Sequence, residues 1–137
     1  MVLHDADGRV LLVRENYGHR RWGLPGGEMA PAESPAAAAI RETAEETGLE
    51  VELAYLVGVY HLRGDRPGLR FIFQGTIVRG APTLQPGGEI AEIEWFAPDA
   101  LPAPMTHTAP HGIRDAVAGN RGAFREIDRR IEPRRDA

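Results

Sequence analysis

The chain has 137 residues, of which 20 are acidic and 16 basic, giving a formal net charge of −4. The length fits a single domain over residues 1–137, and the negative charge argues against an extended nucleic-acid surface. Cysteine and lysine are absent, which excludes thiol nucleophiles, disulfides and Schiff-base chemistry. The one serine, Ser34, reads as a helix cap, which argues against a serine hydrolase.

Nothing in the sequence predicts a targeting or membrane segment. No apolar run approaches the roughly 20 residues that cross a bilayer, and residues 1–7 lack a signal-peptide pattern. We therefore expect a cytoplasmic protein. The chain opens almost inside a strand, so its first residue need not be the natural start. A homodimer is left open because dimers are common.

In the first half of the chain, residues 2–4 and 9–14 predict two strands joined by a turn. A polar loop leads to the turn-rich residues 22–27. The clearest element is a helix over 35–47, which follows the N-cap Ser34, starts at Pro35 and stops at Gly48.

The second half favours strands over 51–60, 69–78 and 90–96, with a loop over 61–68 and a helical turn over 98–101. Helices are predicted over 112–118 and 123–131. The pattern predicts an α/β fold, with a mixed sheet flanked by the central helix and C-terminal helices.

Three carboxylates of the central helix share one side of it. At about 100° per residue, the side chains of Glu42, Glu45 and Glu46 fall within an arc of about 100°. We expect the apolar stripe on the other side to face the sheet and the acidic side to face solvent or a cleft. That stripe comprises Ala36, Ala37, Ile40, Thr43 and Ala44.

A solvated face is the simplest interpretation of such a cluster, but two features oppose it. Glu42 and Glu46 are like charges at i,i+4, which repel, and Glu45 and Glu46 lie where the helix dipole disfavours anions. Arg41 could pair with Glu45, which would leave Glu42 and Glu46 without partners in the helix. A divalent cation held by carboxylate oxygens would compensate these charges.

These residues resemble the signature of the Nudix hydrolase superfamily. Gly27, five residues, Glu33, seven residues, and then the run Arg41 to Leu49 meet every fixed position of that signature. Thr43 departs from it, because an aliphatic residue is usual there; we expect a small change in packing and no loss of chemistry. The resemblance implies a Nudix-type α/β/α sandwich.

The resemblance also implies hydrolysis of a diphosphate linked to another group, with Mg²⁺ or, as a substitute, Mn²⁺. Glu45 and Glu46 match the family's metal ligands, and Glu42 matches a ligand or general base. Gly26 matches a glycine whose carbonyl can reach a metal. The pair Glu33 and Arg41 matches structural support of the motif, together with Gly27 and Gly48.

Family members often place another catalytic or metal-binding carboxylate in a later loop. Glu89, in the turn before the strand over 90–96, is the candidate. Glu92 and Glu94 are rivals, but they lie inside the strand and are expected to face solvent. An exposed loop residue without a role is an equally good interpretation of Glu89.

Other side chains have weaker signals. Arginines around the loop over 61–68 could grip phosphate or simply be solvated: Arg63, Arg66 and Arg70. Aromatic residues that could stack on a base are Tyr17, Tyr60 and Trp22. Trp22, beside the glycines, is the best of them, but packing in the core is at least as good an interpretation of it. His107 and His111 have a metal-like spacing, but Pro110 between them predicts a loop.

Three functions remain open from the sequence. The first is a pyrophosphohydrolase acting on a small nucleoside diphosphate derivative. The second is a catalytically silent nucleotide-binding sensor with the same fold, which the presence of Glu42, Glu45 and Glu46 disfavours. The third is a prenyl diphosphate isomerase, disfavoured because that branch of the family typically relies on a cysteine.

Overall fold

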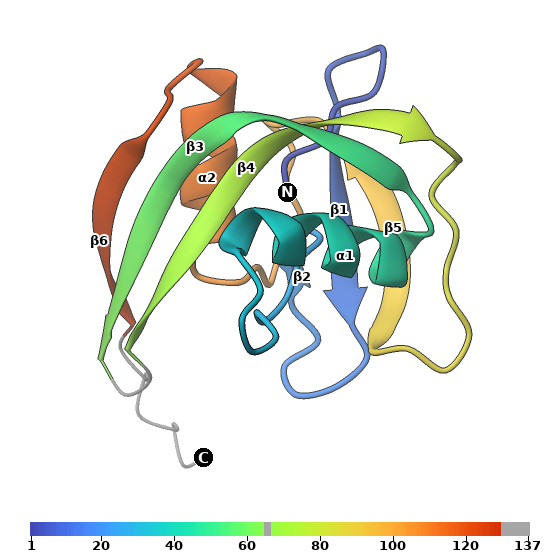
Figure 1. Cartoon of the computed structure of the whole chain (residues 1–137), viewed down its shortest axis with the longest axis horizontal. Coiled ribbons are helices and arrows are strands. Elements are labelled where there is room, and N and C mark those ends of the chain that lie inside the picture. The colour runs from blue at the N-terminus through green and yellow to red at the C-terminus, as the bar shows by residue number, and fades with distance from the viewer. Residues whose placement is uncertain (65–66, 130–137) are drawn as a thin grey trace.

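The computed structural model describes residues 1–64 and 67–129 (Figure 1). Two helices and six strands follow one another along the chain: β1 (Val10–Glu15), β2 (Trp22–Gly23), α1 (Pro35–Thr47), β3 (Glu50–Gly64), β4 (Gly68–Arg79), β5 (Ile90–Phe96), α2 (Ala109–Val117) and β6 (Ala123–Arg129). None of the described helices has the length and hydropathy to span a membrane.

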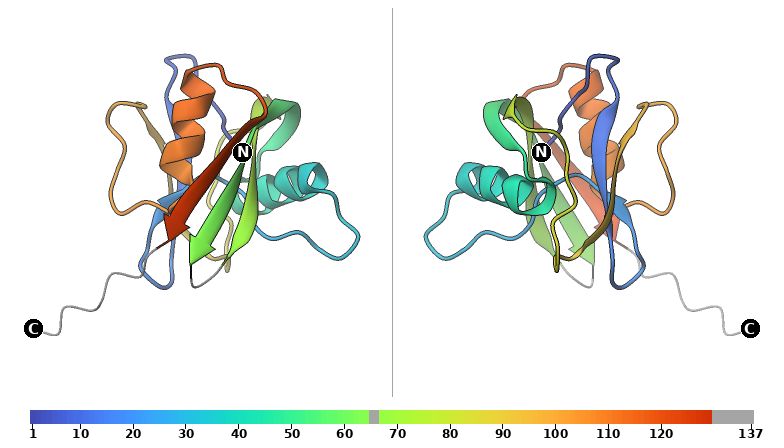
Figure 2. Two further views of the ribbon diagram at one scale, coloured as in Figure 1. Left: turned by 90° about the vertical axis from the view of Figure 1, so that its left-hand side faces the viewer. Right: turned by 90° about the vertical axis from the view of Figure 1, so that its right-hand side faces the viewer.

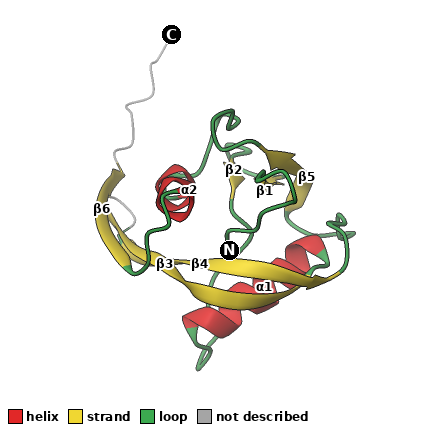
Figure 3. Cartoon of the chain, turned by 90° about the horizontal axis from the view of Figure 1, so that it is seen from above, coloured by secondary structure: helices red, strands yellow, loops and turns green. Residues whose placement is uncertain are grey.

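The strands form two three-stranded sheets rather than one. The first has the order β2-β1-β5 and is antiparallel; the second has the order β4-β3-β6 and is mixed, because β6 runs parallel to β3. Helices α1 and α2 lie on opposite sides of the β3–β4 ribbon, and the first sheet lies on the side of α2 (Figures 2 and 3). The predicted α/β class with flanking helices is confirmed.

The predicted helix over 123–131 is wrong for its described part. Residues 123–129 form strand β6, which pairs with β3 from Gly58 to Gly64, while 130–131 lie outside the described residues. Arginine and glutamate suggested a helix, but pairing with the exposed edge of β3 overrides that local preference. Only one helix therefore covers the C-terminal side of the described chain, and α2 includes most of the predicted 112–118.

Other boundaries differ less. Strand β3 continues to Gly64 and β4 begins at Gly68, so most of the loop expected over 61–68 belongs to a longer hairpin. The first predicted strand is reduced to isolated bridges, from Val2 to Gln74 and from His4 to Val10. Around 98–101 there is one hydrogen-bonded turn, in which Ala100 N–H donates to Ala97 O.

The core consists of two clusters on either side of β1. Val10 and Leu12 belong to the larger cluster, between the two sheets and α2, whereas Leu11 belongs to the smaller one. Strand β1 is therefore buried on both faces. The smaller cluster also contains Leu49, directly after α1, and it packs against Ala39 of that helix.

Helix α1 begins and ends as the sequence predicts. Ser34 Oγ accepts a hydrogen bond from Ala37 N–H, and Gly48, with a φ of 72°, donates to Ala44 O. This left-handed conformation favours glycine.

The expected orientation of α1 is wrong. The fully buried residues are Ala38, Thr43 and Thr47, so only Thr43 of the predicted stripe is buried. Ile40 is 37% exposed, and Ala37 and Ala44 are also exposed. Small side chains let the helix approach the sheet closely, and Glu42 and Glu46 line a cleft, which is one of the two surroundings expected for the acidic side.

Candidate active site

The glycine loop between β2 and α1 lies directly against two carboxylates of the helix. Gly26 has a φ of 149°, which favours glycine, and its N–H donates to Glu46 Oε1 at 2.7 Å. A Cβ on Gly27 would lie 2.6 Å from the carboxyl carbon of Glu42. Gly26 is favoured by its backbone conformation, and a side chain at Gly27 would force the Glu42 carboxylate to move.

A cleft of about 1210 Å³ opens at this contact. It is lined by the glycine loop, the inner side of α1, the start of β4, the turn before β5 and the residues that lead into α2. Six carboxylates contribute to its lining: Glu15, Glu28, Glu42, Glu45, Glu46 and Glu89. A concave site that collects this much negative charge is suited to a cation or to a cation-bound ligand.

The cleft raises the pKa of Glu46 to about 7. Burial is the largest cause, because it disfavours the charged form. The hydrogen bond from Gly26 N–H acts in the opposite direction, and the charges of Glu42 and Glu89 raise the pKa further. Glu46 is thus part of a group of carboxylates that repel one another at close range.

Arg41 joins the loop before α1 to two carboxylates of the helix. Its Nε and Nη2 donate to both oxygens of Glu33, at 2.8 and 2.9 Å, and Nη2 also donates to Glu28 O. Its Nη1 lies 3.0 Å from Glu42 and 3.1 Å from Glu45. The Arg41 hydrogen bonds lower the pKa of Glu33 to about 2.

One expectation about these charges is corrected by the same contacts. Glu42 does have a partner in the helix, because the guanidinium of Arg41 reaches it as well as Glu45. Among the described ion pairs, Glu46 has no arginine partner; its hydrogen bond comes from the backbone of Gly26. Of the three helix carboxylates, Glu46 is the one that Arg41 does not reach.

Of the three later carboxylates, one lines the cleft and two do not. Glu89 lines the cleft, in a turn held to the end of β1 by Asn16, whose N–H donates to Glu89 O and whose side chain donates to Gly88 O. Glu92 and Glu94 are exposed on β5 and do not line the cleft; Glu92 lies 3.5 Å from Arg14 instead.

Among the aromatic candidates, only Tyr17 lines the cleft, where it is 52% exposed. The expectation that Trp22 is the best stacking residue is not met: it is buried and packs edge-on against Phe96, with ring centroids 5.0 Å apart. Tyr60 is fully buried and donates to Asp115.

The loop arginines and the two histidines also differ in whether they line the cleft. Arg70 lines the cleft, Arg63 pairs with Glu126 and Asp128, and Arg66 lies outside the described residues. The loop expected at His111 is wrong, because α2 begins at Ala109 and tolerates Pro110 in its first turn. His107 precedes the helix and lines the cleft.

Sequence reasoning missed a basic contribution to the cleft. Arg21, before β2, and Arg129, at the end of β6, line it together with His107. These residues are far apart in the sequence and belong to no motif, so no local pattern could have grouped them.

The donor set fits a hard divalent cation by its chemistry. The groups at hand are carboxylate oxygens of α1, the Glu89 carboxylate and backbone carbonyls of the glycine loop, which are the ligands that Mg²⁺ prefers. Burial is the main cause of the raised pKa of Glu46, and the charges of Glu42 and Glu89, which raise it further, are charges that a cation would offset. In the described part of the chain, no three His, Asp or Glu side chains already stand in a metal-binding arrangement, so binding would require carboxylates to move.

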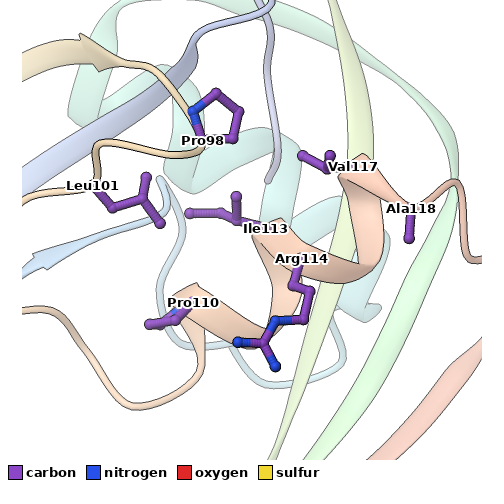
Figure 4. A pocket seen from close by; sticks show the side chains of 7 residues that line it. All are labelled: Pro98, Leu101, Pro110, Ile113, Arg114, Val117 and Ala118. Atoms are coloured by element: carbon purple, nitrogen blue, oxygen red, sulfur yellow. The ribbon is translucent and has the colours of Figure 1, made fainter.

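A second pocket, of about 410 Å³, lies on the outer side of α2 (Figure 4). Its lining is mainly apolar: Pro98, Leu101, Pro110, Ile113, Arg114, Val117 and Ala118. It contains no carboxylate and no candidate residue from the motif. The cleft at the glycine loop is therefore the candidate active site.

Comparisons with known proteins identify the family of the chain. A family model described as NUDIX domain matches residues 1–116. A provisionally named 8-oxo-dGTP diphosphatase of Bacillus subtilis (strain 168) is 34% identical over 87% of this chain and 77% of its own length. Diphosphoinositol polyphosphate phosphohydrolase 3-alpha of Mus musculus is 33% identical over 78% of this chain, which spans 66% of that protein.

Solved structures share the fold. A NUDIX hydrolase from Nitrosomonas europaea superimposes with a TM-score of 0.77 and 30% identity, over 88% of this chain and 87% of the other.

Proposed function

This chain belongs to the NUDIX domain family of hydrolases, and we propose that it is a Mg²⁺-dependent pyrophosphohydrolase that cleaves a nucleoside diphosphate linked to another group. Water attacks phosphorus, and the P–O–P bridge is broken. The observation that carries the proposal is the contact of Glu42 and Glu46 with the Gly26–Gly27 loop inside a large acidic cleft.

The carboxylates of the cleft have different proposed roles. Glu45 and Glu46, with the carbonyl of Gly26, would hold the cation, for which Mn²⁺ could substitute. Glu42 would be a further ligand or the base that accepts a proton from water. Glu89 is proposed as the additional carboxylate, because it lines the cleft and its charge acts on Glu46.

A divalent cation, when bound, neutralises a diphosphate and lowers the pKa of bound water. The chain's own residues provide the rest. The bidentate contact between Arg41 and Glu33 fixes the loop to the helix, and the same guanidinium contacts Glu42 and Glu45. The glycine loop lets backbone approach the ligand closely.

The test is a panel of diphosphate substrates assayed for released phosphate or monophosphate with and without Mg²⁺. We expect Mg²⁺-dependent turnover by the natural chain. Glu46→Gln should reduce kcat by roughly 10³-fold, because it weakens transition-state stabilisation by several kcal/mol. Glu52→Gln, the same change at an exposed residue of β3 outside the cleft, should leave kcat unchanged.

Equal inactivity of the natural chain and of Glu46→Gln on the whole panel, with a nucleotide still bound, would overturn the proposal in favour of a sensor. Calorimetry adds a direct check: the natural chain should take up Mg²⁺ or Mn²⁺ in the presence of a nucleotide, and Glu46→Gln should take up less.

A further inference from the structure

One part of the cleft is basic rather than acidic. Arg21, Arg70, His107 and Arg129 line it and come from four separate segments of the chain. The start of β4 and the end of β6 lie on either side of the end of β3, at the lower left of Figure 1, whereas the start of β5, next to the turn with Glu89, lies at the lower right. We call the part of the cleft with Arg21, Arg70, His107 and Arg129 its basic end and the part with Glu42, Glu46 and Glu89 its acidic end; Glu15, whose N–H donates to Arg21 O, also lines the cleft beside Arg21.

The arginines Arg21 and Arg129 differ from several arginines elsewhere in the chain. Arg41 and Arg63 are each paired with carboxylates, as is Arg125. Within residues 1–64 and 67–129, Arg21 and Arg129 form no ion pair. Their charge is therefore available to a ligand that enters the cleft.

His107 lies close enough to Arg21 and Arg129 for their charges to affect it. Its pKa is lowered, first by burial and then by the positive charges of Arg21 and Arg129. Three basic groups that disfavour one another's charge have little structural reason to converge. A bound anion would relieve their repulsion, as a cation would relieve that of the carboxylates at the other end.

Helix α2 adds to the same positive region. It has nine residues, its first turn contains no acidic side chain, and the side chain of its N-cap, Thr108, makes no capping hydrogen bond. Thr108 and Ala109 both line the cleft. The positive end of the helix dipole thus contributes to the same part of the cleft.

We propose, on the basis of the function proposed above, that Arg21, His107 and Arg129 bind an additional phosphate or similar anionic group of the substrate, outside the diphosphate that is cleaved. The acidic end would hold the diphosphate through a divalent cation, and the basic end would bind the second anion directly. The substrate class is then a diphosphate whose other moiety carries its own negative charge.

Anion binding can be measured without hydrolysis and without metal. Inorganic pyrophosphate is titrated into the natural chain in EDTA at constant ionic strength, and the ring signals of His107 are followed by NMR, assigned with a His107→Gln variant. Without a cation the carboxylates repel the anion, so we expect a saturable shift at His107. Arg21→Gln and Arg129→Gln should each weaken binding by about 10-fold or more.

Arg114→Gln is the matched control, since Arg114 lines the other pocket and not this cleft; it should bind pyrophosphate like the natural chain. No saturable shift at His107, or the same affinity in Arg21→Gln as in Arg114→Gln, would overturn the proposal. This binding assay involves neither metal nor turnover. If the chain binds pyrophosphate but is inactive on every substrate, the proposed hydrolysis is refuted and the proposed anion site is not.

The substrate class is tested with two pairs that differ by one phosphate: NADPH with NADH, and coenzyme A with its 3′-dephospho form. Dissociation constants measured in EDTA should favour the phosphorylated member of at least one pair by about 10-fold, and Arg21→Gln should remove that preference. Equal constants within both pairs would overturn the assignment of a second anionic group.

Discussion

Two arginine-centred networks hold helices to neighbouring segments, and they differ in the burial of their carboxylates. Around Arg41 the partners are partly exposed, with side-chain exposures of 16% for Glu33, 21% for Glu42 and 58% for Glu45. Around Arg125 the partner is Asp115, a residue of α2 that is 1% exposed.

The buried network leaves Asp115 fully hydrogen-bonded. Both of its oxygens accept from Arg125, Tyr60 donates to one of them and Asn120 to the other. These contacts, that of Arg125 above all, hold the pKa of Asp115 well below its usual range. The Arg125 network therefore fixes α2 to β3 and β6. The Arg41 network, with the same chemistry, orients carboxylates that are still free to rearrange around a ligand.

Asp115→Asn should have the largest effect on stability. The change removes the charge that faces Arg125 and leaves a buried group with mismatched donors, so we expect a loss of about 3 kcal/mol in unfolding free energy. The matched control is Asp128→Asn, which affects the exposed pair with Arg63 and should change stability little. Urea denaturation measures both; equal losses would contradict the contrast between the networks.

Arg41→Gln should act mainly on activity. It frees Glu42 and Glu45 from the loop, and loss of such an orienting partner typically costs 10- to 100-fold, so we expect kcat to fall by about that factor. The Mg²⁺ concentration for half-maximal rate should rise. Arg79→Gln is the control, because Arg79 of β4 forms an exposed ion pair with Glu50 of β3. The midpoint of thermal unfolding should be similar in both variants; a fall in stability without a fall in kcat would assign Arg41 to the scaffold.

The buried network should contribute to the pH dependence of stability in acid. Because the folded state holds the pKa of Asp115 below its ordinary value of 3.8, this group's contribution is complete above that value and is lost as pH falls below it. Between about pH 4 and pH 2, the unfolding free energy of the natural chain should decline more steeply than that of Asp115→Asn. Parallel declines would mean that Asp115 is not the group that titrates.

The grouping of the candidate residues was predictable because they lie in one local motif. Helical spacing groups Glu42 with Glu46, the resemblance to the family signature adds the glycines, and the structure places Gly26 and Gly27 against these two carboxylates. The rotation of α1 was not predictable in this way. It depends on how closely Ala38, Thr43 and Thr47 let the helix approach the sheet, and hydrophobicity alone pointed to Ile40.

Long-range pairing explains the remaining errors. Strand β6 forms because the edge of β3 is available to it, which the composition of 123–129 does not reveal. The basic end of the cleft depends on the same pairing, since β6 brings Arg129 to the cleft that Arg21 and His107 also line. What the sequence could not supply was the position of segments that are distant along the chain.

Thr43→Val should have the smallest effect. The threonine is fully buried where the family signature has an aliphatic residue, and its hydroxyl donates to Ala39 O at 2.7 Å. That carbonyl also accepts the regular helical bond from Thr43 N–H, so valine leaves no buried group unpaired. We expect a change in unfolding free energy within about 1 kcal/mol and an unchanged kcat. A large fall in kcat would mean that the packing of this side chain, and not Arg41 alone, positions Glu42.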